Sequence, residues 1–234
     1  MRYAFLLVSI LPAALLARSA QAQSEGDAAA YLALTLTPTG AFAPLAGASW
    51  LDDSARGAFS LRYGRLSYDD DDSIHNIGVS ADFGAGRSRV GITAGAVTCS
   101  ECDAILMFGA DWTTSLVRRA STERTVGVGM TIAGGAGIPT ADGADGMALS
   151  ASVGLPITLV AGNPSGLRVI PYLTPAIGFG TLTGEGGASG VRPMLAGGIG
   201  FAAANGVGLS AGVQKVFIEG GEAVLGLALT IGGR

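Results

Sequence analysis

The clearest pattern in the chain is a strict alternation of apolar and small residues between Val191 and Phe217. From residue 191 the odd positions are mostly aliphatic or aromatic, whereas the even positions are mostly Gly and Ala. The alternation resumes at Val207, after Ala203-Ala204-Asn205-Gly206. A period of two places successive side chains on opposite faces of a strand. Because Asn-Gly between two such runs is a strong hairpin signal, we predict two strands joined by a tight turn.

The same pattern recurs along most of the chain after residue 55. Eight further runs share it, and their apolar faces begin at Phe59, Ile77, Val90, Leu106, Val126, Met147, Val169 and Leu225. About ten runs of this length match tilted membrane-spanning strands. Short turns follow the second, sixth and eighth runs, whereas most other connections are longer and rich in Asp and Gly. In outer-membrane barrels the short turns are periplasmic, so we place the turn at Asn205-Gly206 on that side.

The composition favours a membrane barrel over a water-soluble domain. Only 14% of the 234 residues are charged, 38 are Gly, and the mean hydropathy is +0.47. Soluble domains carry about 25% charged residues. After the N-terminus no stretch has the roughly 18 consecutive apolar residues of a membrane-spanning helix, which leaves a closed barrel as the spanning structure. We therefore predict an all-β, antiparallel, up-and-down transmembrane β-barrel of about ten strands (roughly eight to twelve).

A soluble, exported β-barrel or sandwich is the second fold hypothesis. The net charge of -4 provides no basic patch, so no nucleic-acid partner is expected.

The chain divides into three predicted segments. Residues 1–22 are a predicted signal peptide, with Arg2, an apolar centre over Ala4–Ala17 and a small-x-small cleavage site at Ala20-Gln21-Ala22. Residues 23–54 are interpreted as an N-terminal arm or an insert into the lumen, although Tyr31–Thr37 also fits a strand. Residues 55–234 form the predicted barrel.

Charged residues in the middle of the predicted strands lie on the small-residue faces. A charge on the lipid face costs roughly 2–4 kcal/mol at the midplane for Arg or Lys, so these faces should line the lumen. The predicted lumen charge network comprises Arg62, Asp82, Arg89, Asp111, Arg168 and Arg192. Asp82 and Arg89 flank one short turn and are expected to face each other. The alternative role of these six residues is to line a selective channel. Lys215 lies on the apolar face near a strand end, where it can snorkel.

Other candidate sites have simpler interpretations. Cys99 and Cys102 are expected to form a disulfide in an outside loop, because export makes the environment oxidising. A metal or redox site is the alternative, but zinc requires about four ligands and His75 is the one His of the chain. Asp69–Asp72, Asp142 and Asp145 are interpreted as solvated loop acids, with divalent cation binding as the alternative. No catalytic residue, metal site or cofactor is predicted.

The end of the chain carries the spacing of a barrel-closing strand. Gly226 is followed by Leu229 and Ile231, three and five positions later. In this respect the chain resembles small bacterial outer-membrane β-barrel proteins over residues 55–231. In that family these positions are usually aromatic and a terminal Phe follows, whereas this chain ends Gly232-Gly233-Arg234.

The resemblance implies a location and partners. These are the outer membrane of a Gram-negative type envelope, its lipid and lipopolysaccharide, and the barrel assembly machinery. The leading functional hypothesis is a porin-like barrel of structural or passive-permeability type that is not an enzyme. Alternatives are a channel or transporter for small solutes, with residues 23–54 as the gate, and a protein that binds or adheres through its surface loops.

Overall fold

The computed structural model describes residues 20–41, 57–67, 73–85, 87–99, 103–121, 124–140, 146–163, 165–184 and 187–233. Most of the predicted signal peptide, the segment 42–56 and the acidic runs at 69–72 and 142–145 lie outside these ranges. Among the described helices, none combines the length and the apolar character that a membrane-spanning helix requires.

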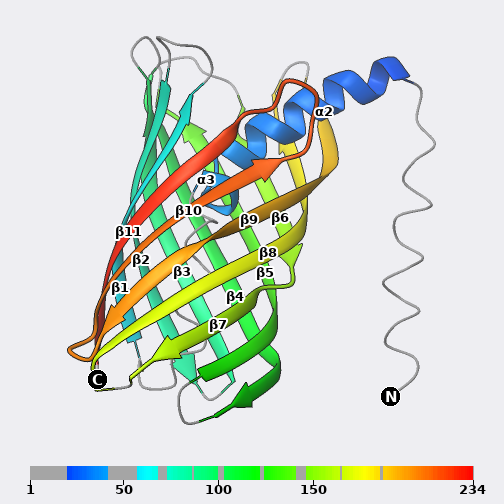
Figure 1. The fold of residues 1–234 in the computed structure, drawn as a ribbon. Helices are drawn as coiled ribbons and strands as arrows, with labels where there is room; N and C mark the ends of the chain where they lie inside the picture. The colour runs from blue at the N-terminus through cyan, green and yellow to red at the C-terminus, as the bar shows by residue number, and fades with distance from the viewer. Residues whose placement is uncertain are drawn as a thin grey trace.

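The barrel is built from antiparallel strands that pair in chain order (Figure 1). The strands are β1 (Gly57–Ser67), β2 (Ser73–Ala85), β3 (Ser88–Thr98), β4 (Ile105–Ala120), β5 (Arg124–Pro139), β6 (Ala148–Gly154), β7 (Ile157–Gly162), β8 (Leu167–Leu182), β9 (Ser189–Ala203), β10 (Val207–Val216) and β11 (Ala223–Gly233). The last strand pairs with the first, from Gly57 with Gly233 to Leu66 with Val224, and this pairing closes the sheet.

The strands β6 and β7 occupy one position in the barrel. Both lie between β5 and β8, and the break between them falls at Leu155-Pro156. Pro156 has no N–H to donate to the sheet, which accounts for the interruption. The described residues therefore form a closed barrel of ten strand positions, as the alternation predicted.

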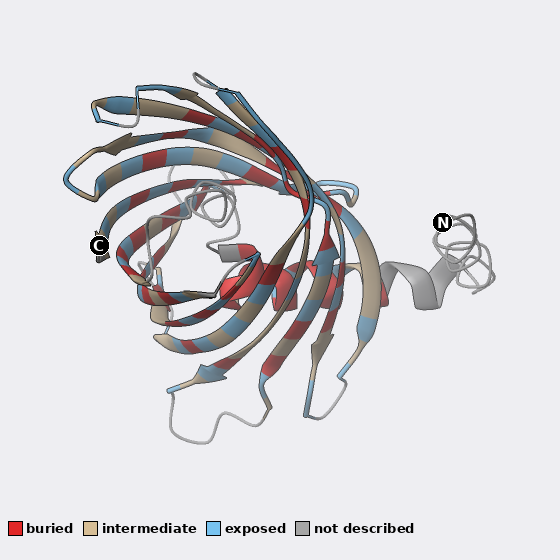
Figure 2. Cartoon of the chain, turned by 90° about the horizontal axis from the view of Figure 1, so that it is seen from below, coloured by how far each residue is buried: buried red, intermediate tan, exposed pale blue. Residues whose placement is uncertain are grey.

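Side chains alternate between the two faces of the barrel wall as the sequence predicted (Figure 2). In β1 the odd positions Phe59 and Leu61 are exposed on the outside, whereas Ser60 and Arg62 are buried inside. The aliphatic and aromatic faces of the other strands are exposed in the same way, and the Gly, Ala, Ser and Thr faces line the lumen. Closure of the sheet gives every backbone N–H and C=O group of the wall a hydrogen-bond partner. The apolar exterior suits a lipid environment.

The helices are α2 (Ala20–Thr35) and α3 (Pro38–Ala41); α3 and the later part of α2 lie within the barrel, and the start of α2 projects past its rim (Figures 1 and 2). The alternative of a strand over Tyr31–Thr37 is wrong, because the chain is helical to Thr35. Leu36 N–H donates to Leu32 O at 2.8 Å, and Thr35 Oγ1 donates to Tyr31 O at 2.9 Å. A closed barrel offers no free strand edge, so an Ala-rich segment inside it satisfies its own backbone by forming a helix.

The two rims of the barrel differ in the length of their connections. The short-turn rim carries the turns at 86–87, 121–123, 163–166 and 204–206, together with the end of β11. The long-loop rim carries the other connections. At the short-turn rim Gly206 has φ +88° and Asn205 Oδ1 accepts from Val207 N–H at 3.1 Å, as expected for an Asn-Gly hairpin.

The orientation in the membrane can be tested with single cysteines at the two rims. Asn205→Cys lies in a short turn and Glu219→Cys in the connection from β10 to β11, and both positions are exposed. A membrane-impermeant maleimide applied to intact cells should label Glu219→Cys and leave Asn205→Cys unlabelled until the outer membrane is permeabilised. The reverse labelling pattern would show that the barrel is inserted the other way round.

Candidate functional site: a lumen occupied by an N-terminal plug

The segment 26–41, here called the plug, is the main occupant of the lumen among the described residues. Ala30, Ala33 and Leu34 of α2 are completely buried, and Thr37 after it is also completely buried. The helix contacts β6, β8 and β9. A short surface helix would expose one face to water, so burial of this extent indicates a docked element.

Glycines in the wall allow the plug backbone to approach closely. A Cβ at Gly180 of β8 would lie 2.6 Å from Ala30 O and 3.0 Å from Ala33 Cβ. At Gly178 it would lie 2.8 Å from Leu34 Cδ2. These separations are below van der Waals contact. At Gly180 the neighbour is backbone, so only glycine fits there without a shift of the helix, whereas at Gly178 the side chain of Leu34 would have to move. The small-residue face predicted to be the lumen wall is therefore also the docking face for the plug.

A second glycine pair receives the end of the plug. Cβ atoms at Gly109 of β4 and Gly135 of β5 would lie 3.1 Å and 2.9 Å from atoms of the Pro38 ring. Hydroxyl groups add hydrogen bonds beside this contact. Thr37 Oγ1 and Ser150 Oγ are 2.6 Å apart, and Ser150 Oγ donates to Thr39 Oγ1 at 2.8 Å.

Apolar residues of the inner wall also hold the plug, near the long-loop rim. Tyr31 and Leu34 form one buried cluster with Leu66, Met194, Val216 and Val224. Leu36 packs against a second cluster made by Val97 and Met107. These large residues occupy positions on the inner face where most other residues are small. Large apolar residues at such positions are the signal in the sequence that could have indicated an apolar partner inside the barrel.

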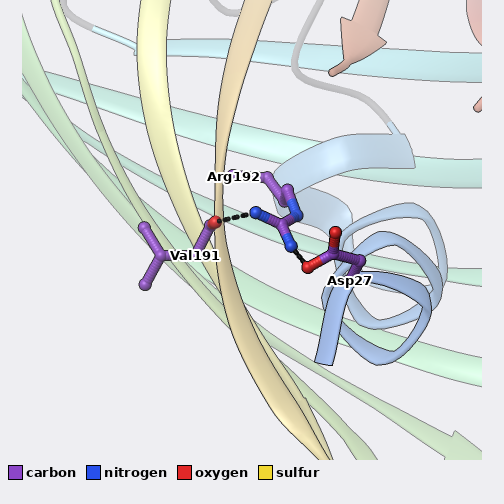
Figure 3. A network of polar contacts seen from close by, with 3 residues as sticks. All are labelled: Asp27, Val191 and Arg192. Carbon is purple, nitrogen blue, oxygen red and sulfur yellow. Dashed lines mark hydrogen bonds and ion pairs between the residues drawn. The ribbon is translucent and has the colours of Figure 1, made fainter. Parts of the chain in front are cut away.

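Polar contacts fasten α2 to the long-loop rim. The Arg192 guanidinium forms an ion pair with Asp27 and also donates to the carbonyl oxygen of Val191 at 3.0 Å (Figure 3). The hydroxyl of Tyr31 accepts from Glu222 N–H at 3.1 Å and lies 3.4 Å from Glu222 O. Asp27 and Tyr31 were not identified from the sequence, because their partners are more than 160 positions away in the chain.

Four of the six predicted network charges gather on β1 to β4. Arg62, Asp82 and Arg89 are each 6% exposed on the lumen face. Asp111 interacts electrostatically with all three of them. One oxygen of Asp82 and one of Asp111 both approach the place where Gly91 would carry a Cβ, so the two carboxylates share a small space. Arg62 and Arg89 therefore offset the repulsion between two neighbouring acids.

Asp82 and Arg89 were expected to face each other, but they lie on a diagonal across β2 and β3. In the register of β2 and β3, Asp82 lies opposite Gly91, and Arg89 lies opposite Gly84. The two side chains share the inner face, but they are two positions out of register, because the turn places Ala85 opposite Ser88. Diagonal neighbours on one face remain within reach of a long side chain.

The other two charges lie elsewhere. Arg192 pairs with the plug, as described above. Arg168 lies opposite Gly162 and Ala202, close to the short-turn rim. The six residues thus all face the lumen but do not form a single cluster, and their joint role stays a prediction.

A cavity of about 70 Å³ separates the end of the plug from the charged cluster. Pro38, Arg62, Asp111 and Gln214 are among its lining residues. Gln214 is 1% exposed, and neither end of its side-chain amide has a hydrogen-bond partner among the described residues. Buried polar groups beside a polar cavity of this size are normally hydrated, so this space suits several ordered water molecules.

Cys99 and His75 lie outside the lumen site. Cys99 is disulfide-bonded, and Cys102, the other cysteine of the chain, lies outside the described residues, so their pairing stays a prediction. His75 is held by Tyr63 and Ser73, a set of contacts that the sequence pattern did not reveal.

The fit of the plug against Gly180 gives a direct test of docking. Gly180→Ala should displace α2, because its Cβ would meet the backbone of Ala30, and overpacking of this kind costs about 1–3 kcal/mol. Limited proteolysis of the detergent-folded protein should then cleave within the plug faster. Gly134→Ala is the matched control, since its Cβ would meet Ser150 O at an ordinary 3.5 Å. Equal protection of both variants would contradict the docked position.

Comparison with known proteins adds only a general likeness of fold. No family model and no curated protein sequence matches the chain. Among solved structures, LpxR from Salmonella typhimurium is 8% identical, with a TM-score of 0.45 over 69% of this chain and 73% of that one. The Ail protein of Yersinia pestis is 13% identical, with a TM-score of 0.34 over 75% of this chain and 94% of that chain.

A third similar structure covers more of the chain. The translocator domain of the autotransporter NalP from Neisseria meningitidis is 12% identical, with a TM-score of 0.37 over 91% of this chain and 99% of that chain. The closed ten-strand wall and its apolar exterior decide the class. The chain folds as a closed antiparallel β-barrel with the apolar exterior of a membrane-spanning barrel.

Proposed function

We propose that this outer-membrane barrel is a structural, non-enzymatic protein whose lumen is kept closed by its own plug. The observation that carries the proposal is the complete burial of Ala30, Ala33 and Leu34 against the inner wall. A barrel of eight strands leaves only enough space inside for side chains. Because the diameter grows roughly in proportion to the number of strands, a barrel of ten strands also has a narrow interior. A docked helix in such an interior leaves little room for a continuous water path.

The proposal is tested by the conductance of the full mature chain in planar lipid bilayers. A closed barrel should give a flat current trace at high protein concentration, with only brief openings. Folding is checked in parallel by heat-modifiable migration on gels, so that a flat trace cannot come from unfolded protein. Steady openings of uniform size from folded protein would contradict a permanently closed lumen.

A gated channel for small solutes is the second candidate, and the ion pair between Asp27 and Arg192 favours it. An ion pair near a barrel rim is weakened by salt and by a change in either partner, so it could release one end of the plug. In this case Asp27→Asn should increase the frequency of openings in the same bilayer experiment. Unchanged opening frequency would favour the closed, structural barrel.

A further inference from the structure

The outer face of the barrel carries a consistent pattern of charge. Within the described strands, both acidic residues, Asp82 and Asp111, face the lumen, whereas the charged residues on the outer face are all basic. Arg65 and Lys215 are exposed near the long-loop rim. Arg119 and Arg124 are exposed at the short-turn rim. Charge of one sign near the ends of membrane-facing strands points to an anionic partner at the membrane surface.

Arg65 has an ordered polar neighbour on the adjacent strand. It lies directly opposite His75 in the register of β1 and β2. Tyr63 Oη and His75 Nδ1 are 2.7 Å apart, and Ser73 Oγ and His75 Nε2 are 2.9 Å apart. The rings of Tyr63 and His75 are stacked, with centroids 5.9 Å apart. The imidazole is therefore fixed in orientation, and hydroxyl groups stand on both sides of it.

Lys215 lies on the same outer face two strands away. The strand β11 separates β10 from β1. Lys215 pairs with Ala223 whereas Arg65 pairs with Leu225, so the two backbones lie about 12 Å apart on a diagonal across the sheet. Leu225 of β11 lies opposite both Arg65 and Val213, and it is 58% exposed beside the two cations. The surface thus combines two cations, hydroxyl donors and an apolar floor. A charge at this depth, near the interface, costs little.

We propose that this surface binds the phosphorylated headgroup of a lipid in the membrane leaflet next to the long loops. A guanidinium offers a planar pair of donors that matches two phosphate oxygens, and Lys215 supplies a second positive charge. The hydroxyl group that accepts from the His75 N–H, either Tyr63 or Ser73, keeps its own proton free to donate to the phosphate, while the acyl chains contact the exposed apolar residues below. This site lies on the outside of the barrel, so it is independent of the plug and of the closed lumen.

The proposal is tested by measuring the affinity of the full, detergent-folded chain for lipopolysaccharide and for the same lipopolysaccharide after chemical removal of its phosphates. Dephosphorylation should weaken binding to the wild type about tenfold or more. The double variant Arg65→Gln with Lys215→Gln should lose a similar factor with intact lipopolysaccharide. Both side chains are exposed, so the variant should fold normally, which gel migration verifies.

Two further arms make the result specific. Arg119→Gln removes one exposed cation at the opposite rim and should bind within twofold of the wild type, about the limit for a change away from the site. Inorganic phosphate alone should compete only at far higher concentration than the lipid. Equal binding of the dephosphorylated lipid, an unaffected double variant, an equal loss in Arg119→Gln, or equally tight binding of inorganic phosphate would each overturn the proposed lipid headgroup site.

Discussion

Deleting residues 26–41 should increase the conductance of the folded barrel about tenfold or more, because the deletion removes the side chains that fill the lumen at the long-loop rim. The wall itself should remain closed. Each strand pairs with its neighbours, and β1 pairs with β11, without help from the plug. The measurement is single-channel conductance in planar bilayers, with the full mature chain as the reference.

The deletion needs a control for folding and one for the site of the change. Heat-modifiable gel migration of the deleted chain shows whether the barrel is closed. The variant Gly134→Ala keeps the plug and should leave conductance at the level of the unmodified chain. A folded, deleted barrel with an unchanged flat trace would mean that the plug does not block the lumen, and the closed-barrel proposal would fail.

Replacing Arg62 by Met should destabilise the barrel by about 3–5 kcal/mol, because removal of one partner leaves buried charges without compensation. Arg62 is 6% exposed and interacts with Asp111, which also lies beside Asp82. Without Arg62, Arg89 is the remaining cation of this cluster that offsets the repulsion between the carboxylates of Asp82 and Asp111. The measurement is urea unfolding of the protein in lipid vesicles, followed by tryptophan fluorescence.

Two variants separate this electrostatic effect from a general effect of losing an arginine. Arg65→Met changes the same residue type on the same strand, but on the exposed outer face, and should alter stability by less than about 0.5 kcal/mol. Asp111→Asn added to Arg62→Met should recover much of the loss, since it removes one of the two repelling acids. Equal losses for Arg62→Met and Arg65→Met would show that the lumen charges do not act together.

The alternation in the sequence was sufficient to predict the wall of the barrel. A strand next to lipid must place apolar residues at every second position, so the pattern of Phe59, Leu61 and the following runs revealed both the strands and the face that meets the membrane. The same rule placed Arg62 and Asp82 in the lumen. Pro156 divides one predicted strand into β6 and β7, a local effect of the missing N–H that left the topology unchanged.

The arrangement of residues inside the barrel depends on contacts between segments far apart in the chain, which no local sequence pattern reveals. Tyr31–Thr37 alternates well enough to fit a strand, but inside a closed barrel it has no free edge to pair with, and it forms the end of a helix instead. Asp27 pairs with Arg192, and Thr37 with Ser150, across more than a hundred residues of sequence. Short-range periodicity cannot encode such pairs, because it reports only which way a side chain points.

For this protein the sequence by itself determined the strands, their two faces and the membrane environment, since each of these follows from the burial of apolar side chains at a period of two. The tertiary structure alone decided what the small-residue face meets. The sequence predicts that Gly178 and Gly180 belong to the lumen wall. In the folded chain Gly180 admits the backbone of α2, and Gly178 admits the side chain of Leu34. That role depends on the close approach of α2 to β8, which exists only once the barrel has closed around the helix.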